Sequence, residues 1–178
     1  MEDALKSSLW GPWSRVGLQA ALATLVVDQA QKWWMIKGVG LPECVRERCI
    51  TITVTPFLDL KYVRNTGISY SLLDQKTMTG QYVLAIFALI ASVALWIWLA
   101  RSGTGRLMAV SLGLIIGGAV ANGIDRVVLG GVADFFSLHV GSFYWYIFNL
   151  ADVAIVAGVA GLLYDSYLTS RKDAAKAG

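Results

Sequence analysis

The stretch A-N-G-I-D-R-V-V-L-G-G-V-A-D-F-F (residues 121–136), together with F-N-L-A-D (residues 148–152), decides the fold of this chain. Aspartates, asparagines and an arginine stand here among residues that are otherwise almost all apolar. A charged side chain inside a bilayer is costly, so each ionisable residue in such a segment is a candidate for a functional role. The polar residues of the two stretches are Asn122, Asp125, Arg126, Asp134, Asn149 and Asp152.

The composition indicates a membrane protein. Of the 178 residues, 56% are hydrophobic and only 15% are charged, and the mean hydropathy is +0.59. Soluble domains usually carry about 25% charged residues. The net charge of +3 is small and the chain has no Lys/Arg run, so we expect no nucleic-acid partner.

Four stretches are long and apolar enough to cross a bilayer, which takes about 20 helical residues. They are residues 15–36, 81–100, 107–128 and 144–164. The first could also be a signal peptide, but no small-residue cleavage site follows it. The link between the second and third spans and the C-terminal tail are basic, and basic residues in short loops prefer the cytoplasm. We therefore expect both termini inside the cell.

The outer loop between the first two spans, residues 37–80, has the pattern of a small sheet. C-I-T-I-T-V-T (residues 49–55) alternates as strands do, and F-L-D-L-K-Y-V-R (residues 57–64) predicts a second strand. Asn65-Thr66-Gly67 indicates a turn, and residues 68–73 are apolar enough to lie at the lipid surface. An irregular loop is the alternative. We therefore predict an all-α membrane protein, one domain over residues 1–178, with four transmembrane helices and a small extracytoplasmic sheet.

The two cysteines, Cys44 and Cys49, lie in this same outer loop. An extracytoplasmic compartment permits a disulfide, and the sequence leaves a bridge and two free thiols both open. No second Cys or His pair accompanies them, and neither an H-E-x-x-H motif nor a Gly-rich phosphate loop occurs. We expect no metal site and no cofactor.

Polar residues from three spans fall at one depth. Asp28 lies roughly 12 Å below the outer end of the first span, and Asn149 and Asp152 roughly 8 to 12 Å below the outer end of the fourth. Four more lie in the last two turns of the third span or just past its end: Asn122, Asp125, Arg126 and Asp134. These groups should converge in the outer leaflet.

Helical spacing predicts ion pairs within this group. Asp28 and Lys32 are four residues apart and share a helix face, as an ion pair would. Asp125 is followed directly by Arg126. We interpret Asp125 as a buried partner that holds helices in register, in preference to a catalytic acid.

Asp134 and Asp152 have no adjacent basic residue, so they are the stronger candidates for catalysis. Two carboxyl groups a few Å apart share one proton, because both cannot easily ionise. The ionised member can take a proton from water while the protonated member hydrogen-bonds a scissile carbonyl. Such aspartic-protease chemistry requires no metal. The only histidine, His139, has no Ser or Cys spaced to act with it.

A small proton-coupled transporter or channel subunit is the alternative function, since intramembrane acids and bases also form proton relays. The acids cluster at the outer side, however, and do not continue to the cytoplasmic half. The sequence also has no inverted repeat and no pair of broken helices. These features favour an enzyme.

Four blocks of sequence carry a family resemblance: V-V-D-Q-A-Q-K-W (residues 26–33), N-T-G-I-S-Y-S-L-L (65–73), G-G-A-V-A-N-G-I-D-R-V-V-L-G-G-V-A-D-F-F (117–136) and F-N-L-A-D-V (148–153). In this order they resemble the signature blocks of lipoprotein signal peptidase, also called signal peptidase II. Residues 68–70, I-S-Y, depart from the family pattern, where small residues followed by Phe are common. The two cysteines belong to no family motif.

The resemblance implies an aspartic endopeptidase of the bacterial inner membrane, with a periplasmic β-cradle and a site toward the periplasm. Its substrates would be prolipoproteins that carry diacylglycerol on a cysteine, cleaved on the N-terminal side of that cysteine. Globomycin, a cyclic depsipeptide, would inhibit it, membrane lipid would surround it, and one chain would hold the whole site. By motif, Asp134 and Asp152 are the catalytic pair. The supporting or substrate-contacting positions would be Asp28, Lys32, Asn65, Gly118, Asn122, Asp125, Arg126 and Asn149.

Two further patterns concern packing. Small residues four apart in the third and fourth spans, such as Gly113 with Gly117, predict close helix approach. Aromatic residues flank the predicted site and could receive acyl chains or form an interfacial belt. We expect the belt for Tyr144 and Trp145 and leave both roles open for the phenylalanines Phe135, Phe136 and Phe143.

Overall fold

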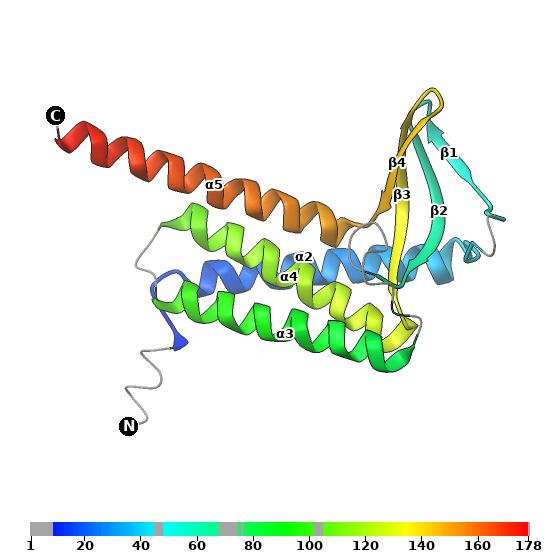
Figure 1. Cartoon of the computed structure of the whole chain (residues 1–178), viewed down its shortest axis with the longest axis horizontal. Helices are drawn as coiled ribbons and strands as arrows, with labels where there is room; N and C mark the ends of the chain where they lie inside the picture. The colour runs from blue at the N-terminus through cyan, green and yellow to red at the C-terminus, as the bar shows by residue number, and fades with distance from the viewer. Residues whose placement is uncertain (1–8, 45–47, 68–74, 76, 102–104, 178) are drawn as a thin grey trace.

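The computed structural model describes residues 9–44, 48–67, 75, 77–101 and 105–177, with side chains in the last helix described to residue 175. Within these residues, four long helices form a bundle and a four-stranded sheet stands across one end of it (Figure 1). The Ser14 end of the first helix and the Ala177 end of the last lie at the opposite end (Figure 1).

The helices are α2 (Ser14–Trp33), α3 (Met78–Arg101), α4 (Arg106–Leu129) and α5 (Leu150–Ala177), and α2 continues into the π-helical turn η1 (Trp34–Gly38). The first three agree closely with the predicted spans. In the described part of the chain, three helices are long and apolar enough to cross a membrane: α3, α4 and residues Leu150–Ala175 of α5. Helix α2, with its three charged residues, is not one of these.

Helix α4 packs against α2, α3 and α5 and forms the centre of the bundle. Glycines on α4 and α5 allow this close packing. A Cβ on Gly117 would lie 2.8 Å from the Cβ of Thr24 in α2, and a Cβ on Gly158 would lie 2.6 Å from the backbone oxygen of Ser111. The predicted small-residue contacts are confirmed. The outer surfaces, by contrast, expose large apolar side chains such as Ile90 (63%) and Leu163 (69%), as lipid-facing helices do.

The sheet consists of β1 (Ile52–Thr55), β2 (Leu58–Asn65), β3 (Val132–Val140) and β4 (Phe143–Phe148), antiparallel and in that order. The two strands predicted in the first outer loop are confirmed as β1 and β2. A side-chain oxygen of Asn65 accepts the N–H of Gly67 at 3.0 Å, which forms the predicted turn. The prediction that residues 68–73 lie at the lipid surface falls outside the described residues.

The second outer segment differs from the prediction. Residues 144–164 were expected to form a helix, but β3 and β4 form a hairpin and α5 begins only at Leu150. Residues 143–148, F-Y-W-Y-I-F, are apolar enough to form the start of a membrane span. Aromatic residues also favour strands, however, when a partner strand is available. Gly141, with φ of +59°, forms the tight turn that brings β4 back along β3.

Two features fix the sheet to the bundle. The segment that follows η1 contacts β2, because the N–H of Cys44 donates to the carbonyl of Tyr62 at 2.7 Å. A disulfide joins Cys44 to Cys49 within this segment. Beneath the sheet, Tyr62 stacks on Phe135 with ring centroids 5.1 Å apart, in an apolar core that includes Met35 of η1. Phe135 is fully buried, so it belongs to this core and is not available to receive acyl chains.

Candidate active site

The polar residues of the sequence motifs meet where α2, α4 and α5 reach the sheet. Asp134 is the third residue of β3, and it pairs with Val63 in the β2–β3 register. Asn65, at the end of β2, donates from Nδ2 to Oδ2 of Asp134 at 3.2 Å. The predicted convergence of these motifs is therefore present in the structure.

Helix α5 begins with a reciprocal hydrogen-bonded cap. Oδ1 of Asn149 accepts the N–H of Asp152 at 2.9 Å, and Oδ2 of Asp152 accepts the N–H of Asn149 at 3.2 Å. This capping box satisfies two backbone donors that a helix start leaves free. Asp152 thus lies in the first turn of α5, and Asn149 lies before the helix. The predicted depth of 8 to 12 Å along a helix that starts at Tyr144 was wrong, because α5 starts later.

Two asparagines connect the two candidate catalytic acids. Nδ2 of Asn149 donates to Oδ1 of Asp134 at 2.6 Å and to Oδ1 of Asn122 at 3.2 Å. Nδ2 of Asn122 in turn donates to Oδ1 of Asp152 at 3.0 Å. The carboxyl groups of Asp134 and Asp152 are therefore held from β3 and α5 by one continuous chain of amides.

The environment of Asp134 favours its protonated form. Its side chain is only 2% exposed, and this burial is the main cause that raises its pKa from 3.8 to about 7. The nearby negative charge of Asp152 raises the pKa further, while hydrogen bonds from Asn149 and Asn65 and the charge of Lys32 lower it. Near neutral pH the pair can therefore hold one proton.

Lys32 is buried beside this pair and is balanced by acidic residues. Its Nζ lies 2.8 Å from Oδ2 of Asp28, 2.6 Å from Oδ2 of Asp125 and 3.1 Å from Oδ1 of Asn122. The three N–H groups of the ammonium thus have three acceptors, and only 2% of the side chain is exposed. The predicted Asp28–Lys32 pair is confirmed, and it is part of a larger buried cluster.

Asp125 and Asp28 also hold backbone groups of the site. Oδ2 of Asp125 accepts the N–H of Ala133, directly before Asp134, at 3.1 Å. Oδ1 of Asp28 accepts the N–H of Ala151, in the first turn of α5, at 2.8 Å. Both carboxylates therefore tie a helix to the segment that carries a candidate catalytic acid. The interpretation of Asp125 as a structural partner agrees with these contacts.

Other residues of the cluster have partners that the sequence did not indicate. Arg126 does not pair with Asp125; its guanidinium donates to the carbonyls of Asn122 and Gly67, each at 3.1 Å. Gln29 donates to Oδ1 of Asp125 at 2.8 Å. Sequence reasoning missed Gln29, although it lies beside Asp28 in an apolar run, where any polar residue is a signal.

Gly118 has a steric role in this geometry. It lies in α4 under the first turn of α5, where a Cβ would be 2.6 Å from the backbone oxygen of Ala151. Only glycine allows this approach. The position therefore sets the distance between α4 and the turn that carries Asp152.

A cavity of about 340 Å³ opens beside the pair. Its polar wall includes Asp152, Asn122 and Arg126, and its other walls are apolar side chains of α3 and α5 such as Phe87 and Val156. The contribution of α3 could not be predicted, because apolar residues in a membrane span look alike in sequence. The cavity places the polar candidate site next to a surface that suits hydrocarbon.

The fold and site define the class of protein as a membrane-embedded enzyme. A carboxyl pair with one proton can act as general base and general acid. The model of the family described as signal peptidase (SPase) II matches residues 20–168. This chain belongs to the signal peptidase II family and is a peptidase. The alternative function, a proton-coupled transporter or channel subunit, is therefore set aside.

Individual relatives agree. The chain is 51% identical to the lipoprotein signal peptidase of Methylocella silvestris over 88% of each chain. It is 50% identical to that of Nitrobacter hamburgensis over 92% of this chain and 97% of the relative. Two solved structures of bacterial membrane enzymes superpose with TM-scores of 0.68 and 0.64, at 27% and 29% identity, over 88% and 83% of this chain and 90% of each of them.

Proposed function

We propose that this chain is an aspartic endopeptidase that removes the signal peptide from diacylglyceryl-modified bacterial prolipoproteins, cleaving on the N-terminal side of the lipidated cysteine. The observation that carries this proposal is the linkage of Asp134 and Asp152 through Asn149 and Asn122. The substrate class is supported by relatives that are lipoprotein signal peptidases and match along nearly their whole length.

The roles of the two acids follow from their surroundings. Asp152 lies at the N-terminus of α5, where free backbone N–H groups favour negative charge, and it accepts hydrogen bonds from Asn149 and Asn122. Asp134 is buried in β3 with its pKa raised to about 7. We therefore assign the ionised form to Asp152 and the protonated form to Asp134.

Hydrolysis then proceeds in two steps. The Asp152 carboxylate takes a proton from water, the hydroxide attacks the scissile carbonyl carbon, and Asp134 donates its proton to the carbonyl oxygen. The resulting diol collapses as Asp152 gives its proton to the leaving nitrogen and Asp134 takes one back from a hydroxyl. The C–N bond breaks, and the pair returns to its starting state without a metal.

The proposed topology has four spans, with both termini in the cytoplasm and the sheet and site on the periplasmic side of the inner membrane. Helix α2 is the first of these spans along the chain, and it can cross the bilayer because its buried Asp28 and Lys32 face α4 and α5 and not the lipid. The Cys44–Cys49 disulfide supports an oxidising compartment at the sheet end. Arg101 and Arg106 lie at the other end, as basic residues near the cytoplasm do.

The cavity suits a substrate that stays anchored in the bilayer. Acyl chains on the cysteine would remain among lipids along the apolar walls of α3 and α5, which places the scissile bond at the depth of the pair. Asn65, Asn122 and Arg126 line the same cavity and are the groups placed to contact substrate. A globomycin-type inhibitor would compete for this space. We further propose that the chain works as a monomer.

The lipid requirement provides the test. Purified protein in detergent is incubated with two prolipoprotein peptides of one sequence, one carrying diacylglycerol on its cysteine and one with a free cysteine. We expect cleavage of the modified peptide alone, directly before the cysteine, and inhibition by globomycin. Equal cleavage of both peptides, or cleavage at another bond, would contradict the assigned substrate.

A further inference from the structure

The outer end of the β3–β4 hairpin exposes a cluster of large apolar side chains. The exposed fractions are 78% for Val140, 62% for Phe143, 56% for Phe57 and 48% for Trp145. With Leu138 and His139 these residues line a hollow of about 320 Å³. We call Phe57, Leu138, Val140, Phe143 and Trp145 the hairpin patch. A contiguous apolar surface of this kind marks a site of interaction.

The hairpin patch continues the face of the sheet that carries Asp134. Side chains alternate along a strand, so Asp134, Leu138 and Val140 of β3 share one face. Val140 pairs directly with Phe143 of β4, and paired residues lie on the same face. One face of the sheet therefore runs from the candidate catalytic acid outward to the apolar tip.

The opposite face is polar at the same end of the sheet. Nε2 of His139 lies 3.3 Å from Oδ2 of Asp59, and the His139 ring stacks on Tyr144 at 4.9 Å. Nζ of Lys61 lies 5.3 Å from the centre of the Tyr144 ring. Tyr144 thus belongs to the polar face of the sheet, and its expected place in an interfacial aromatic belt stays a prediction. The tip of the sheet is amphipathic.

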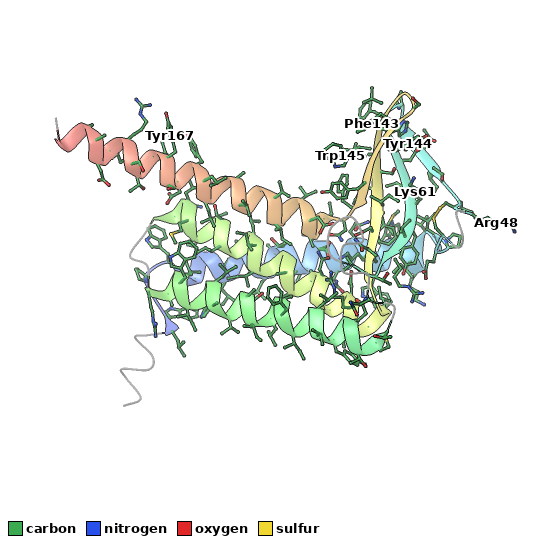
Figure 2. All side chains as sticks on the ribbon, in the orientation of Figure 1. Arg48, Lys61, Phe143, Tyr144, Trp145 and Tyr167 are labelled. Carbon is green, nitrogen blue, oxygen red and sulfur yellow. A yellow bond between two sulfur atoms is a disulfide. The ribbon has the colours of Figure 1, made fainter. Side chains whose placement is uncertain are left out.

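The position of the sheet shows what the apolar face meets. The sheet stands across the end of the bundle and extends past α5, so it runs roughly parallel to the membrane surface when the helices span (Figure 1). Trp145 projects on the side toward which α5 runs, whereas Arg48 projects on the other side (Figure 2). The hairpin patch therefore overlies the lipid beside α5.

We propose that the hairpin patch is a membrane anchor that inserts into the headgroup and acyl boundary of the outer leaflet. Aromatic side chains with an apolar body favour this zone, and an amphipathic element lies in it with its polar face in water. The anchor holds β3 against the membrane, and Asp134 lies on that strand six residues before Val140. The proposal rests on the proposed topology and not on peptidase activity.

The first test measures depth. Val140→Cys is labelled with NBD-maleimide without reductant, in nanodiscs that hold one copy of the chain and lipids with a quencher near the headgroup. Thr53→Cys is the matched control, because Thr53 is an exposed strand residue that pairs with Asp59 of the polar face. We expect blue-shifted emission and severalfold stronger quenching for the label at position 140. Equal, water-like signals from both labels would overturn the anchor.

A second copy of the chain is the competing occupant. A blue shift at position 140 that appears only in nanodiscs with two copies would assign the patch to a dimer contact and overturn the lipid anchor.

In a separate activity test, the double variant Phe143→Ser with Trp145→Ser should raise KM for a lipid-anchored substrate severalfold in bilayers. The same variant should keep kcat within twofold of the wild-type value in detergent. An unchanged KM in bilayers would overturn the positioning effect.

Discussion

Asn149 donates its side-chain amide to Oδ1 of Asp134 at 2.6 Å while it caps the helix that carries Asp152. One residue therefore orients both acids, because the reciprocal cap fixes the first turn of α5 and the amide fixes the carboxyl group on β3. The start of α5 is therefore a candidate functional element as well as a structural boundary.

The pH dependence of activity should have an alkaline limb near pH 7. The ordinary pKa of the Asp134 carboxyl is 3.8 and the folded chain raises it to about 7, so the folded state holds this proton more tightly than the unfolded state does. The stabilisation from this proton is complete below about pH 4 and is lost as pH rises through 7. The proposed mechanism needs the same proton, so kcat/KM should fall above pH 7.

Asn65→Ala tests the assignment of that limb. The hydrogen bond from Asn65 lowers the pKa of Asp134, so its removal should move the alkaline limb to higher pH. Profiles of kcat/KM against pH in detergent provide the measurement, with Thr53→Ala in the exposed strand β1 as the control that should not move. A limb that stays in place or moves to lower pH in Asn65→Ala would show that another group is titrating.

Two glycines of α4 form a matched pair for the helix-spacing argument. A Cβ at Gly118 would lie 2.6 Å from the carbonyl oxygen of Ala151, whereas a Cβ at Gly123 would have no neighbour closer than 3.9 Å. Gly118→Ala should displace the first turn of α5 and lower kcat/KM at least about tenfold, a loss of about 1.4 kcal/mol in transition-state stabilisation. Gly123→Ala should retain activity and gain up to about 1 kcal/mol in helix stability. Similar activities for the two variants would contradict the steric role of Gly118.

The buried ammonium group should be essential for folding. Lys32→Met removes the counter-charge of Asp28 and Asp125, and breaking a buried pair in this way typically destabilises by about 3–5 kcal/mol. Lys37→Met removes an exposed charge of the same type and should change stability by less than about 0.5 kcal/mol. Unfolding monitored in detergent compares the two. Equal stability would mean that the cluster does not hold α2 to α4.

Catalysis should be insensitive to chelators. Among the residues that the structure describes, no group of three or more His, Cys, Asp or Glu side chains is arranged to hold a metal ion. Because the proposed two-acid mechanism uses no metal, cleavage of a diacylated peptide should proceed at an unchanged rate in EDTA. Loss of activity in EDTA that zinc restores would reveal a metal site and reject the two-acid mechanism.

The sequence predicted much of the site because costly polar residues in apolar segments have few explanations. The i,i+4 spacing of Asp28 and Lys32 predicted their contact. The shared depth of polar residues predicted that α2, α4 and α5 contribute to one cluster, although the depth assigned along the last helix was wrong. The position of Asp125 beside Arg126 was a poorer guide. Sequence neighbours on a helix point in different directions, and Asp125 contacts Lys32 from α2 instead.

The β3–β4 hairpin could not be predicted from hydropathy. Residues 143–148 and the start of α5 form one apolar run, and the strand becomes favourable only through pairing with β3. The double role of Asn149 depends on the same boundary, because it caps a helix only if the helix starts at Leu150. The pairing of β4 with β3 therefore determines where α5 begins, and local sequence patterns do not show this boundary.

Mass spectrometry of a diacylated prolipoprotein tests the central claim most directly. The substrate is incubated with the wild-type chain, Asp134→Asn and Asp152→Asn, each first shown to be folded in detergent. We predict that only the wild type releases the signal peptide, with cleavage directly before the lipidated cysteine. Wild-type turnover by either folded variant would contradict a mechanism in which Asp134 and Asp152 share a proton to activate water.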